Sequence, residues 1–389
     1  MDLNRYRMNW NYPTSIRVGA GRIRELPEAC RQLGMGAPLL VTDPGLAALS
    51  IIDKALLQCR DDGLKAGLFH GIKGNPTGAN VMDGVAAFKA GTHDGVIACG
   101  GGSALDAGKA IALMVGQDRP LWDFEDIGDN CMRVNVAGMA PVVAVPTTAG
   151  TGSEVGRAAV ITDDAAQIKR IIFHARMLPA LVILDPELTI GLPAKLTAAT
   201  GMDALSHCLE AFCSPLFHPM AEGIALEGMR LVQQYLPRAV AHGADVEARL
   251  QMLVASSMGA TAFQRGLGAM HALAHPLGAL YDAHHGLLNA VLMPYVLLAN
   301  RASIEAQMEK MARYLNLPKP GFGGVLDWVL ALRSQVGIPH SLGEIGIDAK
   351  RIEQVGRMAA VDPSAGTNPI AFSAEQYSAL FDKALRGEL

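Results

Sequence analysis

Acidic and imidazole side chains recur at short spacings in two parts of the second half of the chain. Asp203 and His207 are four residues apart, so on an α-helix they share one face. Farther along, fifteen residues hold four of the chain's eleven histidines, namely His271, His275, His284 and His285. One carboxylate with up to three imidazoles suits a divalent transition metal such as iron or zinc, and suits calcium or magnesium poorly. These spacings predict a single metal site.

The four downstream histidines do not all fit one ion. His271 and His275 are four residues apart and could form a two-histidine helical pair by themselves. His275 precedes Pro276, which predicts a helix end or bend there. His284 and His285 are adjacent, so a regular element does not easily turn both toward one ion. At most three of the four are therefore expected to be ligands, and the spacing leaves open which. Taken singly, Asp203 as a helix start and His207 as a core histidine remain the ordinary alternatives.

A glycine-rich turn is the second chemical signal. Gly100, Gly101, Gly102 and Ser103 follow an apolar run at residues 95–99 and precede a helical pattern at 104–115. Glycines there let backbone N–H groups approach phosphate oxygens, and a helix N-terminus favours the negative charge. The run lacks the G-x-G-x-x-G spacing, so an ordinary Rossmann fingerprint is not indicated. A tight turn without a ligand is an equally good interpretation of this motif alone.

Two further turns follow other apolar runs. Residues 146–155 contain Thr147, Thr148 and Thr151, whose hydroxyls could bond phosphate or ribose oxygens. Asp43 closes an earlier run, where a carboxylate commonly accepts hydrogen bonds from an adenosine ribose and would repel a 2′-phosphate. By itself Asp43 would be interpreted as a turn or N-cap residue. Three such turns at the carboxyl ends of parallel strands together predict a dinucleotide crevice, with NAD favoured over NADP.

The elements that must position these residues change in kind near residue 190. Before it, short apolar runs at residues 38–43, 95–99, 141–146 and 181–186 alternate with helical segments, which predicts a parallel sheet with crossover helices. After Leu192–Pro193 the strand signals nearly vanish and long helical patterns follow, as at 221–235 and 246–263. We expect an α/β domain over residues 1–190, an all-helical domain over 191–389, and a cleft between them.

Composition excludes several classes of protein. The chain has 389 residues and a net charge of −4, which gives no electrostatic footprint for nucleic acid or an anionic membrane. The apolar runs fall short of the roughly 20 residues of a membrane span, and residues 1–6 lack a signal-peptide pattern. Six scattered cysteines indicate reduced thiols rather than a disulfide framework. We expect a cytoplasmic protein.

Several motifs together resemble the iron-containing (group III) alcohol dehydrogenases: residues 100–103, 146–154, 200–207, 271–278 and 285–291. The similarity runs from about residue 43 to residue 369, most of the chain. It implies a dehydroquinate-synthase-like fold, with an N-terminal NAD(P)-binding domain and a helical metal domain. The metal ligands that it implies are Asp203, His207, His271 and His285. His275 would then act beside the metal in proton transfer, and His284 has no assigned role.

The resemblance also implies the cofactor contacts. Asp43 would meet the adenosine ribose, and the turn formed by Gly100, Gly101, Gly102 and Ser103 would meet the pyrophosphate. The cofactor would be lined by Thr147, Thr148 and Thr151 and reached by Lys169. Asp106 is a further residue expected to bind it. The implied cofactors are Fe²⁺, with Zn²⁺ as the alternative, and NAD rather than NADP.

The chain departs from the family's pattern in two places. The frequent Asn-Asn-Ala stretch before the third ligand is replaced by residues 263–268, apparently one residue shorter. The cysteine of a C-terminal Cys-x-x-Gly-Asn-Pro stretch is missing from residues 362–369. Both regions are expected to face the substrate pocket. Arg157 and Arg265 could admit a carboxylated substrate there, although surface arginines are the simpler interpretation.

The resulting hypothesis is a metal-dependent alcohol dehydrogenase or aldehyde reductase of class EC 1.1.1.-, acting on a small or medium alcohol. A dehydrogenase for hydroxy acids such as 4-hydroxybutyrate, or a metal-dependent lyase or cyclase that uses NAD transiently, are alternatives on the same fold. A metal-free reductase for acidic ketones and a non-enzymatic binding module are less favoured, because the full ligand set coexists with the cofactor turns. We expect a homodimer or larger homo-oligomer.

Overall fold

The computed structural model describes residues 8–10 and 14–389, so residues 1–6, where no signal peptide is expected, lie outside the described part. The chain separates into two compact units. The first runs to Thr148 and resumes over Gly152–Gly191, and the second comprises Ala149–Thr151 and Leu192–Leu389. Each unit is described by itself below.

The first unit is built on a seven-stranded sheet in the order β1-β2-β9-β6-β5-β3-β4. The neighbours from β2 to β4 are parallel, and β1 is antiparallel to β2. The strands are β1 (Met8–Trp10), β2 (Ser15–Val18), β3 (Pro38–Val41), β4 (Gly67–Phe69), β5 (Gly95–Gly100), β6 (Val142–Pro146) and β9 (Leu181–Leu184). The four apolar runs that predict strands thus correspond to β3, β5, β6 and β9, and the predicted parallel sheet is confirmed.

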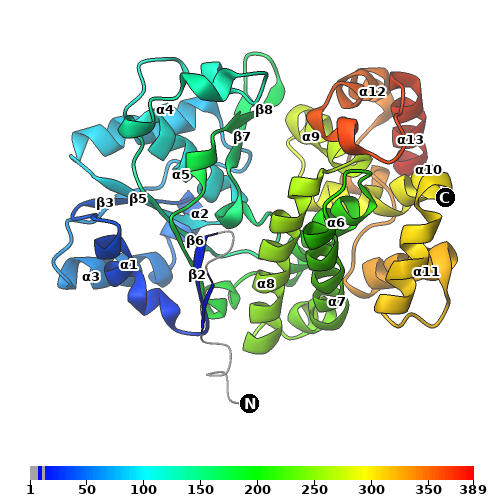
Figure 1. Ribbon diagram of the computed structural model, residues 1–389, viewed down its shortest axis with the longest axis horizontal. Coiled ribbons are helices and arrows are strands. Elements are labelled where there is room, and N and C mark those ends of the chain that lie inside the picture. Colours follow the sequence, from blue (N-terminus) through cyan, green and yellow to red (C-terminus); the bar gives the residue numbers. More distant parts are fainter. Residues whose placement is uncertain (1–7, 11–13) are drawn as a thin grey trace. The chain divides into compact units, whose positions relative to one another are not determined.

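Helices cover both faces of this sheet (Figure 1). Every residue of β3, β5, β6 and β9 is buried, as expected for parallel strands between two helical layers. One face packs against α1 (Leu26–Gln32) and α3 (Ser50–Asp61). The other carries α5 (Gly102–Met114) with α4 (Gly78–Ala90) beside it, and α5 lies so close that a Cβ at Gly108 would come within 2.6 Å of the Ala98 Cβ. A short helix, α2 (Pro44–Ala47), follows β3.

A two-stranded antiparallel hairpin accompanies the sheet and was not expected from the sequence. It joins β7 (Ala158–Asp163) to β8 (Ile168–Phe173). Asp163 closes its turn by accepting hydrogen bonds from the N–H groups of Ala165 and Ala166 and from Arg170 Nε, at 3.2, 3.1 and 2.8 Å.

The second unit is helical, as predicted, and in the described part of the chain every strand ends before Leu192. Its helices are α6 (Ala194–Cys213), α7 (Pro219–Ala241), α8 (Val246–Ala262), α9 (Ala269–Tyr281), α10 (His285–Tyr314), α11 (Gly321–Gln335), α12 (Ile352–Ala360) and α13 (Ala374–Arg386). At its centre α6 packs against α7, α8 and α10, and all its residues from Thr197 to Cys213 are buried. Any polar side chain on this stretch must therefore find a partner inside the protein.

Two features of the helices differ from a simple sequence interpretation. The expected end or bend at His275–Pro276 is not an end, since α9 continues through the proline to Tyr281. The long helix α10 contains an 18-residue window with mean hydropathy 1.3, which by length and composition alone would suffice to cross a membrane. Because 67% of that window is buried inside the fold, we interpret α10 as a core helix.

Candidate active site

Helix α6 carries the first two candidate ligands on one buried face. The side chains of Asp203 and His207 lie one turn apart, and the residues are 1% and 4% exposed. The backbone approaches this face closely: a Cβ at Gly286 would lie 3.0 Å from the Asp203 Cβ, and one at Gly259 would lie 3.1 Å from the His207 Cβ. Small residues on the neighbouring helices α8 and α10 therefore leave room for the two ligands.

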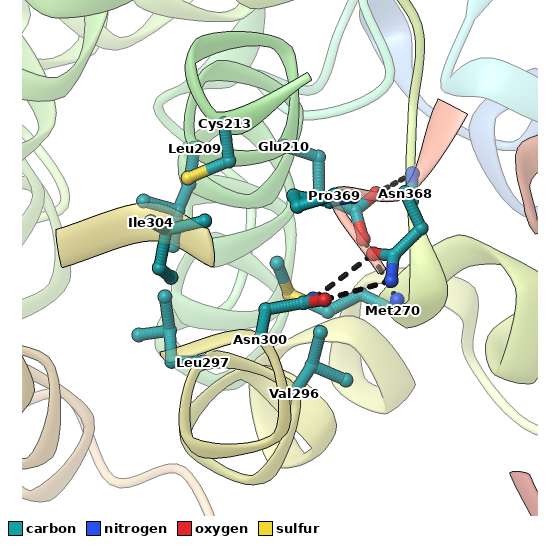
Figure 2. Close-up of a pocket in the computed structure, with 11 residues that line it drawn as sticks. Leu209, Glu210, Cys213, Met270, Val296, Leu297, Asn300, Ile304, Asn368 and Pro369 are labelled. Atoms are coloured by element: carbon teal, nitrogen blue, oxygen red, sulfur yellow. Dashed lines mark hydrogen bonds between the residues drawn. The ribbon is translucent and has the colours of Figure 1, made fainter. Parts of the chain in front are cut away.

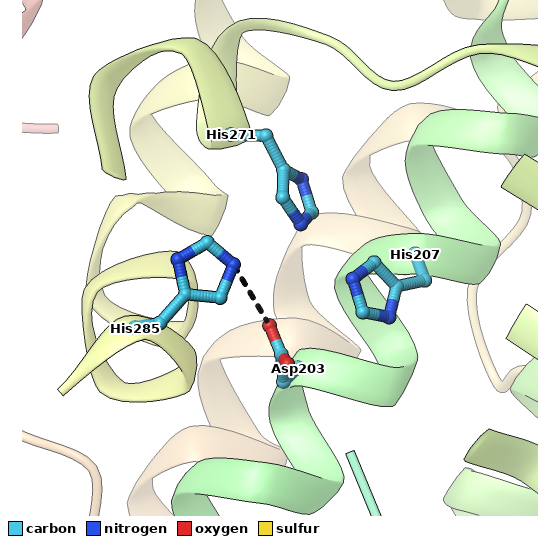
Figure 3. A group of neighbouring side chains, drawn as sticks. All are labelled: Asp203, His207, His271 and His285. Carbon is cyan, nitrogen blue, oxygen red and sulfur yellow. Dashed lines mark ion pairs between the residues drawn. The ribbon is translucent and has the colours of Figure 1, made fainter. Parts of the chain in front are cut away.

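Two histidines from other helices complete the cluster. His271 lies in the first turn of α9 and is 1% exposed, and His285 is the first residue of α10. One ligand atom from each of Asp203, His207, His271 and His285 lies within 4.8 Å of all the others. Figure 3 shows the carboxylate and the three rings gathered around one point, with His285 Nε2 at 3.9 Å from Asp203 Oδ1. The structure thus brings together the four predicted ligands from three helices.

The side-chain amide of Asn289 reports which ring atoms face that point. Its Nδ2 lies 2.9 Å from Asp203 Oδ1, 3.1 Å from His271 Nε2 and 3.2 Å from His285 Nε2. An amide N–H₂ group only donates and has two hydrogens, so it can bond two of these three atoms at a time, and each atom that it bonds presents a lone pair. Lone pairs that converge in this way can also be shared with a cation.

The chemistry of this donor set fits a transition metal. One carboxylate and three imidazoles match the ligands that iron and zinc accept, and four protein ligands leave coordination positions for a substrate. Burial lowers the pKa of His207 to about 4, so its ring is neutral at pH 7 and able to coordinate. The residues present therefore fit the metal that the sequence predicts.

A buried carboxylate, which the sequence interpretation did not single out, holds His271. Glu210 Oε2 lies 2.6 Å from His271 Nδ1, and both side chains are almost completely buried. Burial alone would lower the pKa of His271, but the charge and hydrogen bond of Glu210 outweigh it, so that the pKa lies above its ordinary value. Glu210 follows Asp203 and His207 at helical spacing, which is the signal that could have identified it.

His275 and His284, the other two downstream histidines, have different surroundings. His275 Nδ1 lies 2.8 Å from Asp362 Oδ2, and its ring stacks on that of His285 with centroids 5.5 Å apart. His284 Nδ1 accepts a hydrogen bond from Leu287 N and so caps α10. The histidine beside the ligand cluster is therefore His275, while His284 helps to start a helix.

The segment after α12, which departs from the family's pattern, contacts α9 at both ends. Asp362 holds His275, whereas Thr367 Oγ1 donates to Leu267 O at 2.7 Å. Asn368 Oδ1 accepts from Ala269 N at 3.0 Å and exchanges a pair of hydrogen bonds with Asn300. Figure 2 shows Asn300, Asn368 and Glu210 at the edge of a small and otherwise mostly apolar cavity.

Neither arginine singled out from the sequence is an evident carboxylate receptor. Arg265 is buried, and its guanidinium donates to Phe212 O in α6 and to Leu216 O beyond that helix. Its Nη1 also lies 3.4 Å from Glu222 Oε2, so a carboxylate of the protein already occupies it. Arg157 is exposed and lies over the Phe173 ring, 5.7 Å from its centroid.

The predicted cofactor residues of the first unit gather at one edge of the sheet. β3, β5 and β6 are parallel neighbours, so Asp43, the 100–103 turn and Thr147–Thr148 all follow their carboxyl ends. Thr147 N donates to Gly100 O at 2.9 Å, and a Cβ at Gly101 would lie 3.4 Å from Thr148. Gly101 is the N-cap of α5, and no side-chain hydrogen bond caps this end of the helix. Such an N-terminus suits the binding of an anion. Asp43 caps α2 by accepting from Leu46 N at 2.9 Å.

Asp106, Lys169 and Thr151 have other surroundings. The Asp106 carboxylate accepts hydrogen bonds from Ser153 Oγ and Val160 N, and so ties α5 to the segment after the threonine-rich turn. Lys169 Nζ donates to Asn75 Oδ1 at 2.8 Å. Thr151 falls in the second unit.

Comparison with known proteins identifies the family. Residues 13–186 match the iron-containing alcohol dehydrogenase family, and residues 197–385 match the C-terminal part of the Fe-containing alcohol dehydrogenase family. The chain belongs to the iron-containing alcohol dehydrogenase family.

Relatives are similar in sequence over nearly the whole length of this dehydrogenase. A 4-hydroxybutyrate dehydrogenase from Cupriavidus necator is 38% identical over 96% of this chain and 99% of its own. An NAD-dependent methanol dehydrogenase from Bacillus methanolicus is 34% identical over 97% of this chain and 100% of its own. The crystal structure of a 1,3-propanediol oxidoreductase superposes with a TM-score of 0.91 at 35% identity, covering 97% of this chain and 99% of that one. The dehydrogenase therefore transfers hydride between an alcohol and a nicotinamide cofactor.

Proposed function

We propose that this dehydrogenase uses Fe²⁺, with Zn²⁺ as the alternative metal, and NAD to oxidise primary alcohols, and that it reduces the corresponding aldehydes in reverse. The observation that carries the proposal is the cluster of Asp203, His207, His271 and His285. One carboxylate and three imidazoles, drawn from three helices and with ligand atoms within 4.8 Å of one another, form a donor set that iron and zinc accept.

The metal's contribution is Lewis acidity: held by these four side chains, it would lower the pKa of an alcohol oxygen. The protein's own part is then to hold the substrate and to accept the proton that leaves. His275 fits this second task. Its Nδ1 is engaged with Asp362, which leaves Nε2 as the proton acceptor, and it stacks on a ligand without being one of the four.

Preference for NAD is proposed from Asp43. Its carboxylate follows β3 beside the glycine turn of the neighbouring strand β5, the position at which an acidic side chain bonds the ribose hydroxyls. A 2′-phosphate would meet that negative charge. The remaining cofactor contacts proposed are Gly100, Gly101, Gly102, Ser103, Asp106, Thr147, Thr148, Thr151 and Lys169.

For the substrate we propose a short unbranched alcohol with a terminal hydroxyl, with 4-hydroxybutyrate-type hydroxy acids as the second candidate. The relatives named above act, by their names, on methanol, 1,3-propanediol and 4-hydroxybutyrate, which all carry a primary hydroxyl. The second candidate is favoured by the 38% identity to the 4-hydroxybutyrate dehydrogenase. Because Arg265 bonds two backbone carbonyls and pairs with the Glu222 carboxylate at 3.4 Å, a substrate carboxylate would need another receptor.

The test is metal analysis of anaerobically purified enzyme, followed by NAD⁺ and NADP⁺ assays on primary alcohols, diols and hydroxy acids. We expect about one iron or zinc ion per chain, lost in Asp203→Asn, and NADH formation with at least one alcohol. A chain that carries no metal, or that turns over substrate without net NADH formation, would contradict the proposal. The second result would favour a lyase or cyclase.

The setting of the enzyme is also proposed. The six cysteines are free, and five of them are buried, which suits a reducing compartment such as the cytoplasm. A homodimer or larger homo-oligomer remains a prediction, which light scattering on the purified enzyme would test.

A further inference from the structure

Glu210 is a buried charge on the same face of α6 as two metal ligands. The residue is 4% exposed, and its carboxylate lies against the beginning of α9 rather than in solvent. An ionised carboxylate in such a place destabilises a protein unless donors surround it. What donates to Glu210 therefore indicates what it does.

Three N–H groups of α9 and its N-cap supply those donors. Gly268 N and Met270 N donate to Oε2 and Oε1 at 2.8 and 2.7 Å, and His271 Nδ1 lies 2.6 Å from Oε2. Gly268, the N-cap of α9, has no side chain with which to cap the helix, so a carboxylate from another helix satisfies the first N–H groups and faces the positive end of the helix dipole. A Cβ at Gly268 would lie 2.9 Å from Glu210 Oε1, so the absence of a side chain there permits the approach.

The third bond is the one that capping does not explain. A carboxylate only accepts, so the bond from His271 requires the proton of the neutral imidazole to lie on Nδ1. The lone pair is then on Nε2, the atom that Asn289 Nδ2 approaches to 3.1 Å from the opposite side of the ring. The Glu210 contact thus specifies the tautomer, the Asn289 contact agrees with it, and the nitrogen left as an acceptor is the one that faces the ligand cluster.

We propose that Glu210 is a positioning residue that fixes His271 as the Nδ1–H tautomer and so presents Nε2 to the metal. This rests on the proposed metal site. A carboxylate behind a ligating histidine sets the orientation of the ring and raises its basicity as a ligand. The same carboxylate holds the first turn of α9, so the position of the ring and its protonated atom depend on one side chain.

Asp185 provides a matched comparison within the chain. It is 0% exposed and accepts three hydrogen bonds, from Gly21 N, Ile23 N and Glu187 N at 3.1, 2.9 and 3.0 Å. It therefore resembles Glu210 in burial and in bonding backbone N–H groups, but it touches no histidine. Loss of its charge tests what a buried capping carboxylate contributes by itself.

The experiment compares Glu210→Gln and Asp185→Asn with the wild-type enzyme. Metal-free protein is titrated with Zn²⁺ against a competing chelator, and thermal unfolding is followed for each protein. In Glu210→Gln the amide presents an N–H₂ group either to the ring or to a backbone N–H, which favours the other tautomer or loosens the turn. We expect Zn²⁺ affinity to fall by about 10- to 100-fold. Asp185→Asn should lose stability but keep its Zn²⁺ affinity within about twofold.

A second measurement reports the tautomer directly and needs no activity. In metal-free protein labelled with ¹⁵N-histidine, the Nδ1 of His271 should carry the proton in the wild type, and the signals should shift toward the Nε2–H form in Glu210→Gln. Glu210→Asp keeps the charge at the helix end but withdraws it by one methylene, so an intermediate loss of Zn²⁺ affinity is expected. If Glu210→Gln fails to fold, the Zn²⁺ affinity of Glu210→Asp still tests the proposal.

The outcomes separate the two proposals. Wild-type protein that does not bind Zn²⁺ would contradict the proposed metal site itself. Wild-type binding with unchanged affinity and tautomer in the Glu210 variants would overturn the role given to Glu210. An equal loss of affinity in Asp185→Asn would also overturn it, because general destabilisation would then account for the effect.

Discussion

The rings of His271 and His275 are neighbours on α9, and each bonds a carboxylate through Nδ1. His271 bonds Glu210 through Nδ1 and turns Nε2 to the ligand cluster, while His275 bonds Asp362 through Nδ1 and stacks on His285. One helical turn separates the two rings on α9, and in each a carboxylate fixes the tautomer. In the proposed mechanism, the difference between His271 as a ligand and His275 as a proton acceptor therefore arises from what Nε2 of each ring faces.

The first prediction concerns His275. His275→Ala should retain the metal, because the four ligand side chains are untouched, and kcat should fall by about 100-fold through loss of the proton acceptor. Metal content and steady-state rates measure the two effects separately. His284→Asn is the matched control, since asparagine preserves an N-cap at α10, and its kcat should stay close to that of the wild type. Purified His275→Ala protein without metal would show that His275 is a ligand instead.

A second prediction tests the cofactor preference through Asp43. Asp43→Ser removes the charge and keeps a side chain able to cap α2, so the local fold should persist. Without repulsion of the 2′-phosphate, the ratio of kcat/KM for NAD⁺ to that for NADP⁺ should fall at least about tenfold, equivalent to about 1.4 kcal/mol. Asp53→Asn, an exposed change on α3, is the control. An unchanged ratio would mean that Asp43 serves only as a cap.

At the scale of elements, side chains from elsewhere bond three N–H groups at the beginning of α9. Gly268 N and Met270 N bond Glu210, and Ala269 N bonds Asn368. Because His271 follows directly, the distant segment after α12 and the centre of α6 together determine where this proposed metal ligand lies.

Gly268→Ala should disturb this arrangement. The added Cβ would lie 2.8 Å from Asn368 Oδ1 and 2.9 Å from Glu210 Oε1, so one of the two must move. We expect a loss of about 1–3 kcal/mol in the free energy of unfolding and weaker Zn²⁺ binding. Denaturant unfolding and chelator competition measure them. Gly191→Ala, where a Cβ would meet open space, should change neither quantity. Full metal affinity in Gly268→Ala would show that the first turn tolerates displacement.

The turn of the β7–β8 hairpin gives a prediction that depends on pH. Burial would raise the pKa of Asp163, but the bonds from Arg170 and from the N–H groups of Ala165 and Ala166 outweigh it, and the pKa lies below its ordinary value. Such a group stabilises the fold above about pH 4, its unfolded pKa, and the contribution is lost as pH falls through the lower folded value. Asp163→Asn should therefore cost about 1 kcal/mol at pH 7 and progressively less below pH 4.

Urea unfolding at several pH values checks this, with the exposed neighbour Asp164→Asn as the control. A difference between Asp163→Asn and the wild type that stays constant down to pH 3 would contradict the assignment of the effect to the Asp163 charge.

The sequence predicts those strands and helices whose signals lie within a short stretch of the chain. The apolar runs of β3, β5, β6 and β9 are bounded by turn residues, so their positions follow from short-range chemistry. The β7–β8 hairpin was missed, because its strands are only half buried and its turn contains no glycine. The four side chains that the motifs and the family resemblance single out as ligands do lie together, and their role as ligands stays a prediction. The roles of Glu210 and Asn289 were not, since each depends on contacts between helices that are distant in the sequence.

At the scale of the whole molecule, the proposed cofactor contacts and the proposed metal ligands lie on different kinds of secondary structure. The proposed cofactor turns follow the ends of strands, where backbone N–H groups are available, whereas the proposed metal ligands project from helices, where side chains are held by packing. All four ligands belong to the second unit. A bound metal would thus link α6, α9 and α10 directly, and none of its proposed ligands lies in the first unit.

Removal of the metal should consequently destabilise the helical unit selectively. A ligand present at 100 times its dissociation constant stabilises the folded state by about 2.7 kcal/mol, so a chelator should withdraw roughly that amount. Hydrogen exchange should accelerate in peptides from α6, the first turns of α9 and the start of α10, and change little in the sheet. Added Fe²⁺ or Zn²⁺ should restore protection in the wild type but not in Asp203→Asn, which loses a ligand. Faster exchange spread evenly over both units would contradict this, since it would mean that the metal stabilises the chain as one cooperative body rather than through the three helices that hold it.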